Sequence, residues 1–263
     1  MLRLAAVTAF AFFLVFPIAA TARSRPQSDP LALALAAKSI GTLTGGTTIS
    51  DVTLNGGATW ITGSDKQPGA VTLTALGFGE SRVDLTLVSG VSSEVRDSST
   101  GFASGKWVDT GGVSHSLATH NCLTDAVWFF PALTSLNAGP NVMLSYVAQE
   151  SRAGTAVYHL HSYVFSQGQA FSEDMTRLSS MEFYLDTSTL LPTAITFNAH
   201  PDDDPIGNVQ VEIDFSSYQA IQGMMVPFHV QKYLQGSLVL DLLVSGIQVN
   251  TGLTDSMFST KLK

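Results

Sequence analysis

Few residues of this chain are of types and spacings that could do chemistry, and the first are two histidines on a predicted strand. His159 and His161 point to the same face of that strand, about 6.5–7 Å apart along it. That spacing is usable for two metal ligands. Nothing nearby in the sequence supplies a third or a fourth ligand. We therefore predict no metal site here and interpret the pair as polar residues on a solvated face.

Three consecutive aspartates form the second candidate. Asp202, Asp203 and Asp204 could gather Ca²⁺ in an oxygen-rich turn, but the longer, glycine-containing spacing of an EF-hand is absent. Pro201 and Pro205 flank the run, and Asp and Pro are typical turn residues. The sequence therefore predicts a solvated turn between two strands.

A third group surrounds two further histidines. His115 and His120 lie near Ser114, Ser116 and Asp125, but closeness in sequence does not build a catalytic triad. The chain contains no G-x-S-x-G elbow, no H-E-x-x-H, no phosphate loop and no G-x-G-x-x-G. We therefore predict no catalytic residue, no cofactor and no enzymatic activity.

Cys122 is the only cysteine, so no intramolecular disulfide can form. We predict that it is a small buried hydrophobe on a helix, which is the usual state of a free cysteine. A reactive thiol or an intermolecular bridge is the alternative.

Aromatic and methionine side chains are the best candidates for a binding site, because apolar pockets favour aromatic walls and adaptable thioethers. Ordinary core packing is the alternative for each one alone. Three successive aromatics on one helix cannot all face the same side, so part of that block should contact a ligand, a second surface or a partner. The predicted ligand-binding residues are Trp60, Trp128, Phe129, Phe130, Met224 and Met225.

The elements that would position these residues are mostly strands. Asp29 and Pro30 suit the N-cap and first position of a helix that should end near Ile40, before Gly41. After it, alternation of apolar and polar residues predicts an antiparallel sheet with one solvated face. The predicted strands are 47–54, 57–63, 70–77, 81–89, 91–97, 142–149, 154–165, 180–187, 191–199, 208–218, 226–234 and 237–247.

Turn residues between these runs predict hairpins, so neighbours in sequence should be neighbours in the sheet. The predicted turns are Asn55-Gly56-Gly57, Ser89-Gly90, Ala153-Gly154, Thr187-Ser188 and Gln235-Gly236. Two segments interrupt the pattern. Residues 98–120 are rich in Gly, Ser and Thr and read as a loop. Residues 121–136 predict an apolar helix, kinked by Pro131, that should pack on the concave face of the sheet.

The amino terminus predicts export. Arg3 precedes an apolar run from Leu4 to Ile18, and Ala20-Thr21-Ala22 offers the small residues of a cleavage site. We predict a signal peptide over 1–22 cleaved after Ala22, a polar tether over 23–30 and a single β-rich domain over 31–263. An uncleaved anchor is the alternative, but the run is short of the roughly 20 residues that span a bilayer.

Composition agrees with an exported β protein. Charged residues make up 13% of the chain, well below the roughly 25% of ordinary soluble domains. The formal net charge is −8, and basic clusters are absent, which disfavours nucleic acid and anionic lipid surfaces as partners. The mature chain is not expected to be an integral membrane protein.

The carboxyl-terminal third carries a resemblance to a known family. Asp214-Phe215-Ser216-Ser217-Tyr218 is followed by Ile221-Gln222-Gly223-Met224-Met225-Val226-Pro227, by Gly246-Ile247-Gln248-Val249-Asn250 and by Leu253-Thr254-Asp255-Ser256-Met257-Phe258. This order of short motifs over residues 208–258 resembles the periplasmic lipoprotein-carrier superfamily, of the LolA and LolB type.

The resemblance implies a mainly β fold with a few helices, in which a strongly curved antiparallel sheet forms an incomplete barrel covered by short helices. It further implies a periplasmic, non-enzymatic carrier or sensor with an apolar cavity on its concave face. The ligand would be a lipid, an acyl chain or a lipidated protein. The alternative is an envelope protein-interaction module whose core is filled by its own side chains. The family's lid-closing arginine matches no particular residue of this chain.

Overall fold

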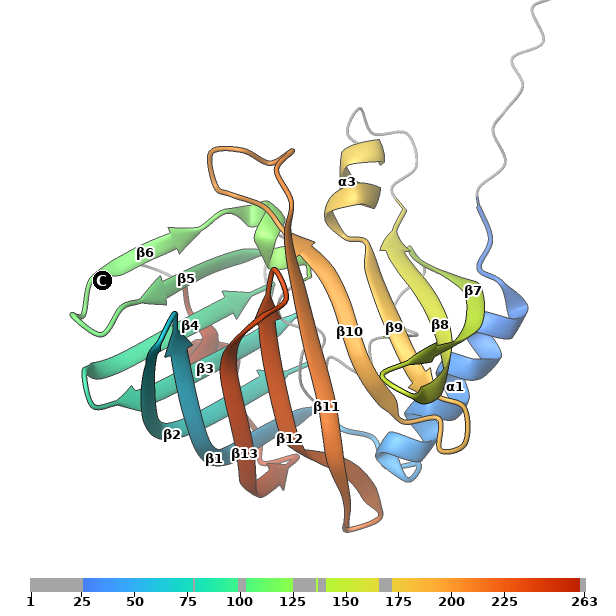
Figure 1. Cartoon of the computed structure of the whole chain (residues 1–263), viewed down its shortest axis with the longest axis horizontal. Helices are drawn as coiled ribbons and strands as arrows, with labels where there is room; N and C mark the ends of the chain where they lie inside the picture. Colours follow the sequence, from blue (N-terminus) through green and yellow to red (C-terminus); the bar gives the residue numbers. More distant parts are fainter. Residues whose placement is uncertain are drawn as a thin grey trace, which may run out of the picture.

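The computed structural model confirms the predicted fold class: one open, curved, antiparallel sheet with helices packed against it (Figure 1). The structure describes residues 26–77, 79–98, 103–124, 136, 141–165 and 172–260. Within them the sheet has 13 strands in the order β6-β5-β4-β3-β2-β1-β13-β12-β11-β10-β9-β8-β7. Every strand neighbours the next one along the chain except β6 and β7, which lie at opposite edges of the sheet, and the two runs of strands join where β1 pairs with β13. The predicted signal peptide and the aromatic segment 128–130 lie outside the described residues.

The elements divide into two runs of strands. The first run is β1 (Asp51–Thr62), β2 (Asp65–Leu76), β3 (Glu80–Leu87), β4 (Gly90–Asp97), β5 (Ser104–Val108) and β6 (Ser114–Leu117). The second run is β7 (Val142–Arg152), β8 (Thr155–Val164), β9 (Met181–Asp186), β10 (Pro192–Ala199), β11 (Val209–Ile221), β12 (Met224–Leu234) and β13 (Ser237–Val249). The described helices are α1 (Pro30–Thr44), η1 (Thr119–Leu123), α3 (Ser172–Leu178) and η4 (Asp255–Phe258).

Helix α1 begins as predicted and ends later than predicted. The Asp29 side chain accepts a hydrogen bond from the Leu31 amide, 2.7 Å away, and Pro30 follows it. The helix continues through Gly41 to Thr44, so the predicted end at Ile40 is wrong. Gly45 ends it in the left-handed conformation, and a Cβ there would lie 2.0 Å from the Gly223 carbonyl oxygen. Only glycine allows this contact between the end of α1 and the β11–β12 turn.

Alternation fixes the two faces of the sheet. We call the face that packs against α1 the inner face and the opposite one the outer face. On β3, Val83 and Leu85 are buried on the inner face, whereas Arg82 and Asp84 form an ion pair on the outer face. Buried inner-face side chains of nearly all the strands join those of α1 in one hydrophobic cluster.

Two strand predictions were wrong for identifiable reasons. Asn55-Gly56-Gly57 is no turn, because β1 runs straight through it and pairs with β2 without interruption. The register with β13 shifts at Asn55/Gly56, and a Cβ on Gly56 would lie 2.2 Å from the Leu243 carbonyl oxygen. The glycine therefore serves a β-bulge with a close backbone approach. The real β1–β2 turn is at 63–64.

The segment 98–120, which the sequence predicts as a loop, contains strands. Short strands β5 and β6 lie within it and extend the sheet beyond β4. The other four predicted hairpin turns are confirmed at the ends of β3, β7, β9 and β12.

The closing motif of the chain ties the first strand to the last. The Asp51 carboxylate accepts hydrogen bonds from the Thr251 amide and hydroxyl and from the Gly252 amide, at 2.7, 2.9 and 3.0 Å. Asn250 bonds back to Ser50. Phe258 is fully buried. The carboxyl-terminal residues that carry the family resemblance thus hold the start of β1 in place.

Candidate functional site

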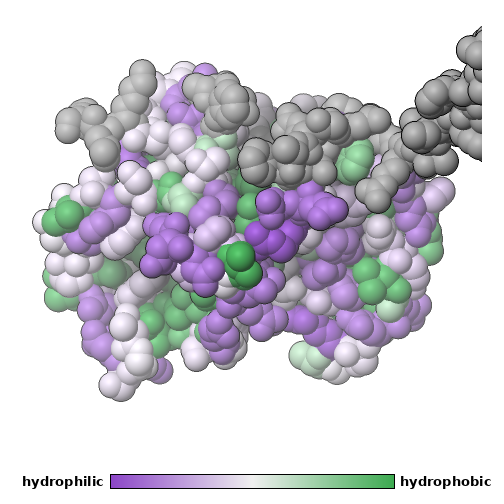
Figure 2. Space-filling model, turned by 90° about the horizontal axis from the view of Figure 1, so that it is seen from above, coloured by the Kyte–Doolittle hydropathy of each residue, from purple (hydrophilic) through white to green (hydrophobic). Residues whose placement is uncertain are grey.

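An apolar cavity of about 390 Å³ lies on the inner face, where β1 and β3–β6 meet β12 and β13. Viewed from above, apolar surface lies within a hollow on this side of the molecule, behind paler residues (Figure 2). The volume is within the range of small-molecule sites. The cavity is lined by Trp60, Val83, Leu85, Ser92, Glu94, Trp107, Leu117, Lys232, Leu234, Val239 and Leu240.

Two tryptophans line this cavity. Trp60 is near the end of β1, and its indole Nε1 donates to the Thr62 hydroxyl at 3.0 Å. Trp107 is on β5 and stacks on the His115 ring, with centroids 4.0 Å apart. Each keeps 37% of its surface exposed, which is high for so large an apolar side chain. The cavity therefore offers two aromatic surfaces that the protein's own core does not cover.

Charged groups of both signs also line the cavity. Glu94 on β4 accepts a hydrogen bond at 2.6 Å from Arg96, whose side chain is only 3% exposed. A second nitrogen of Arg96 donates to the Asn121 carbonyl oxygen at 3.0 Å. Lys232 on β12 also lines the cavity. These groups could orient a ligand that has an apolar body and a polar end.

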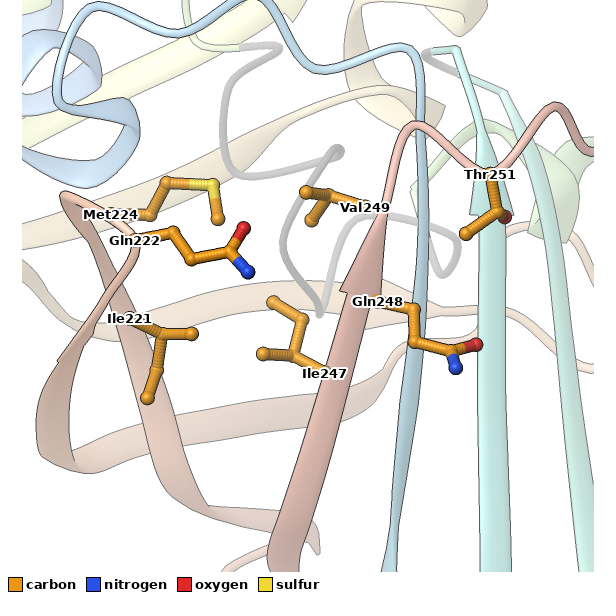
Figure 3. A pocket seen from close by; sticks show the side chains of 7 residues that line it. All are labelled: Ile221, Gln222, Met224, Ile247, Gln248, Val249 and Thr251. Carbon is orange, nitrogen blue, oxygen red and sulfur yellow. The ribbon is translucent and has the colours of Figure 1, made fainter.

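A second, smaller pocket of about 270 Å³ lies at the β11–β12 turn (Figure 3). In Figure 3, Gln222 lies between Ile221 and Met224 and faces Ile247 and Val249 across the space. Polar side chains make up nearly half of its lining. It is therefore a weaker candidate than the inner-face cavity for an apolar ligand.

The predicted binding residues do not all meet in one place. Trp60 lines the large cavity. Met224 is buried in the core and lines the smaller pocket, and Met225 is half-buried against the core. Trp128, Phe129 and Phe130 lie outside the described residues. Sequence reasoning missed Trp107, because the segment around it was read as a loop.

The outer face carries a row of ionisable groups across β7–β9. His159 and His161 share a face, as predicted. Both contact Glu182 on β9, with His159 Nε2 and His161 Nδ1 each 2.8 Å from a carboxylate oxygen. His159 Nδ1 is also 3.4 Å from Glu150. Burial raises the pKa of Glu182, but the two histidines lower it by more, so its pKa is below the usual value.

The row continues across β11. The Arg152 guanidinium contacts Glu212 and lies 4.3 Å from the centroid of the Tyr184 ring. Asp214 sits on the same face as Glu212. Burial and the charge of Glu212 raise the pKa of Asp214 to about 6, against the lowering effect of Arg152.

The other sequence candidates have structural roles. Asp204 accepts hydrogen bonds from the amides of Ile206 and Gly207, so the aspartate run is the predicted turn. Cys122 is buried, as predicted, and its thiol donates to the Ala118 carbonyl oxygen at 3.5 Å. No cluster of three or more His, Cys, Asp or Glu side chains among the described residues has the arrangement of a metal site. Within the same residues, no helix is long and apolar enough to cross a membrane.

Comparisons with known proteins find similar folds among solved structures. No protein family matches the sequence, and no curated protein matches it. A domain assigned to outer membrane lipoprotein sorting, from Vibrio parahaemolyticus, aligns over 87% of this chain and 94% of its own. Its TM-score is 0.54 and its identity 12%. A DUF1329 family protein from Desulfovibrio piger also has a TM-score of 0.54 and 12% identity, covering 89% of this chain and 98% of its own.

A LolA superfamily protein from Nitrosomonas europaea covers 87% of this chain at 11% identity and a TM-score of 0.49. The first two structures span nearly their whole length on this chain, so they share its fold. The predicted resemblance to the lipoprotein-carrier superfamily is thereby confirmed at the level of the fold.

Proposed function

We propose that this protein is an exported, non-enzymatic carrier or sensor that binds an apolar ligand in the inner-face cavity. The ligand class is a lipid, an acyl chain or the acyl group of a lipidated protein. The observation that carries the proposal is a cavity of about 390 Å³ walled by leucines, valines and two partly exposed tryptophans. Such a combination of apolar walls and a few polar groups is typical of small-molecule sites.

The energetics of such a site are favourable. Each methylene removed from water contributes about 0.8 kcal/mol, so burying about six of them would contribute about 5 kcal/mol before the cost of association. Lys232, or the ion pair of Glu94 with Arg96, would meet the polar end of the ligand. A molecule with an anionic or hydrogen-bonding head and an acyl tail fits both features.

Export is part of the proposal. The signal peptide predicted over 1–22 supports delivery of the mature chain to the periplasm, with the expected cleavage after Ala22. Expressed in a Gram-negative host, the protein should be released by osmotic shock with Arg23 at its amino terminus. Recovery of intact Met1 on membrane-bound protein would contradict this part of the proposal.

Tryptophan fluorescence tests ligand binding directly, because two of the three tryptophans of the chain lie at the cavity. In a Trp128→Phe variant, a fatty acid or lipopeptide should shift the emission of Trp60 and Trp107 and protect both from aqueous quenchers. Native mass spectrometry of the protein taken from its own cell envelope should find an apolar molecule bound.

The rival function is an envelope protein-interaction module without a ligand. It predicts no fluorescence response to any apolar compound and no bound molecule in native mass spectra. Both results together would exclude the carrier proposal. In a Trp60→Phe/Trp107→Phe variant, which keeps only Trp128, any remaining response would come from Trp128, itself a predicted ligand-binding residue.

A further inference from the structure

Two histidines far apart in sequence meet where η1 lies against the end of β10. His120 is in η1, which follows β6, and His200 directly follows β10. Their rings lie edge to face, with centroids 6.0 Å apart and planes at 68°. Figure 1 shows the β10–β11 loop reaching toward the segment that follows β6. The pair therefore joins the edge of the first run of strands to the second run.

The pair is held rigidly by the residues around it. The Asn121 side chain donates to the His200 carbonyl oxygen at 2.7 Å and accepts from the His200 amide at 2.8 Å. The Ala118 amide and Asn121 also contact the Asp202 carboxylate, each at 3.4 Å. These bonds clamp η1 to the end of β10. The two imidazoles are thus preorganised by their neighbours.

The tautomer of His200 follows from its surroundings. Its Nδ1 lies 2.7 Å from the Gly207 carbonyl oxygen, which can only accept, so Nδ1 carries the hydrogen. In the neutral ring, Nε2 then presents a lone pair. A ligating histidine commonly has this arrangement, because the second nitrogen is fixed by a backbone carbonyl.

Both Nε2 atoms lack the partner that a buried nitrogen requires. Among the residues that the structure describes, neither His120 Nε2 nor His200 Nε2 has a hydrogen-bond partner, and both atoms are buried. His200 as a whole is only 3% exposed. A buried polar atom without a partner is unfavourable, so two such atoms on rings whose centroids are 6.0 Å apart call for an occupant.

We propose that His120 and His200 bind one divalent transition-metal ion of the Zn²⁺ class through their Nε2 atoms. Imidazole suits Zn²⁺, Cu²⁺ and Ni²⁺, whereas Ca²⁺ and Mg²⁺ select oxygen ligands. No third His, Cys, Asp or Glu joins the pair within the described part of the chain, so water would complete the coordination. The ion would fasten η1 to β10 and so stabilise the cavity side of the open sheet.

The test uses the full mature chain and Zn²⁺ itself as the probe. Long-range ¹H–¹⁵N spectra should show the Nε2 signals of His120 and His200 shifting on addition of Zn²⁺ and unchanged with Mg²⁺. The parent chain alone can therefore decide the question, even where a variant does not fold. No Zn²⁺ response at these two rings would overturn the proposal.

Substitutions sharpen the assignment. His120→Gln and His200→Gln should each weaken Zn²⁺ binding at least tenfold in a calorimetric titration. The matched control is His229→Gln, which changes an outer-face histidine bonded to Asp241. The competing pair is His159 and His161, because both are also close together. Loss of Zn²⁺ binding in His159→Gln/His161→Gln, with retention in His200→Gln, would overturn the proposal and place the ion on the outer face.

Discussion

The inner face of the sheet has two halves that use the same alternation of residues to different ends. Under α1, the strands of the second run fill their space with large side chains that are almost fully buried, among them Leu160, Phe183 and Leu185. On the other side, around β1, β5 and β12, the inner-face side chains leave a cavity of about 390 Å³, with Trp60 and Trp107 each 37% exposed.

The comparison shows how one sheet can be both a stable scaffold and a binding site. Tight packing in the filled half contributes the burial that holds the fold together. In the hollow half, apolar surface stays uncovered. This half therefore contributes less to the stability of the fold, and its uncovered surface is available to a ligand. A substitution in the filled half should therefore change stability, and one in the hollow half should change binding.

The largest effect is expected from Phe183→Ala in the filled half. Phe183 is 2% exposed, and truncating a buried phenylalanine leaves a cavity that costs about 3–5 kcal/mol of unfolding free energy. Urea denaturation should measure this loss. Ligand affinity, measured on the fraction that remains folded, should not change. A loss below about 1 kcal/mol would contradict the picture of a tightly packed half.

The next effect is expected from Trp107→Ala in the hollow half. Because the indole is partly exposed, its loss should cost less stability than that of Phe183. Under the proposed function it should weaken binding of a fatty acid at least tenfold, or about 1.4 kcal/mol. Fluorescence titration, with Trp60 as the reporter, measures the affinity. If Trp107→Ala only destabilised the fold and left ligand affinity unchanged, the two halves would not differ as proposed.

The strands of the second run were predicted better from the sequence than the short strands β5 and β6 beside the cavity. Strands β7–β13 have long, regular alternation, for example Val209, Val211, Ile213 and Phe215, and their order and hairpins were predicted correctly. Period-two patterns of this length have few competing interpretations. The N-cap at Asp29 was equally plain, because its chemistry is local.

The cavity could not be predicted from the alternation of residues. Strands β5 and β6 have five and four residues, which is too short for alternation to stand out in a Gly- and Ser-rich segment. Trp107 was therefore missed. Gly56 is compatible either with a turn or with a close backbone approach. Its pairing with β13 distinguishes the two, and that pairing is not visible in the local sequence. The meeting of His120 with His200 depends on tertiary contacts that no local pattern encodes.

A substitution of Asp214 on the outer face should have a smaller effect on stability, and this effect should depend on pH. The pKa of Asp214 is raised from 3.8 to about 6, chiefly by burial and then by Glu212. The ionised form is therefore disfavoured in the folded state, and stability should rise as pH falls from above 6 toward 4. Asp214→Asn should remove this rise and increase the unfolding free energy at pH 7.5 by about 1 kcal/mol, allowing for solvent screening.

Urea denaturation of Asp214→Asn and the parent across pH 4–8 measures that difference. The matched control is Asp241→Asn on β13, which is also an outer-face aspartate but is hydrogen-bonded to His229 at 2.6 Å. It should not stabilise the protein. Equal effects of the two substitutions would show that general charge reduction, rather than the burial of Asp214, is responsible.

The smallest effect on stability is expected from a substitution of Glu182. This substitution should destabilise the protein, whereas that of Asp214 should stabilise it. Burial alone would raise its pKa, but the hydrogen bonds and charges of His161 and His159 outweigh burial and lower it. A carboxyl group with a lowered pKa contributes stability above its unfolded pKa and loses it as pH falls through the folded pKa. Glu182→Gln should therefore cost about 0.5–1 kcal/mol at pH 6, a modest value because the site is partly exposed. The difference from the parent should shrink as pH falls through the lowered pKa of Glu182, because the carboxyl group then becomes protonated. Denaturation at pH 6 and pH 3.5 distinguishes this from a packing effect, because a packing loss would persist at both pH values.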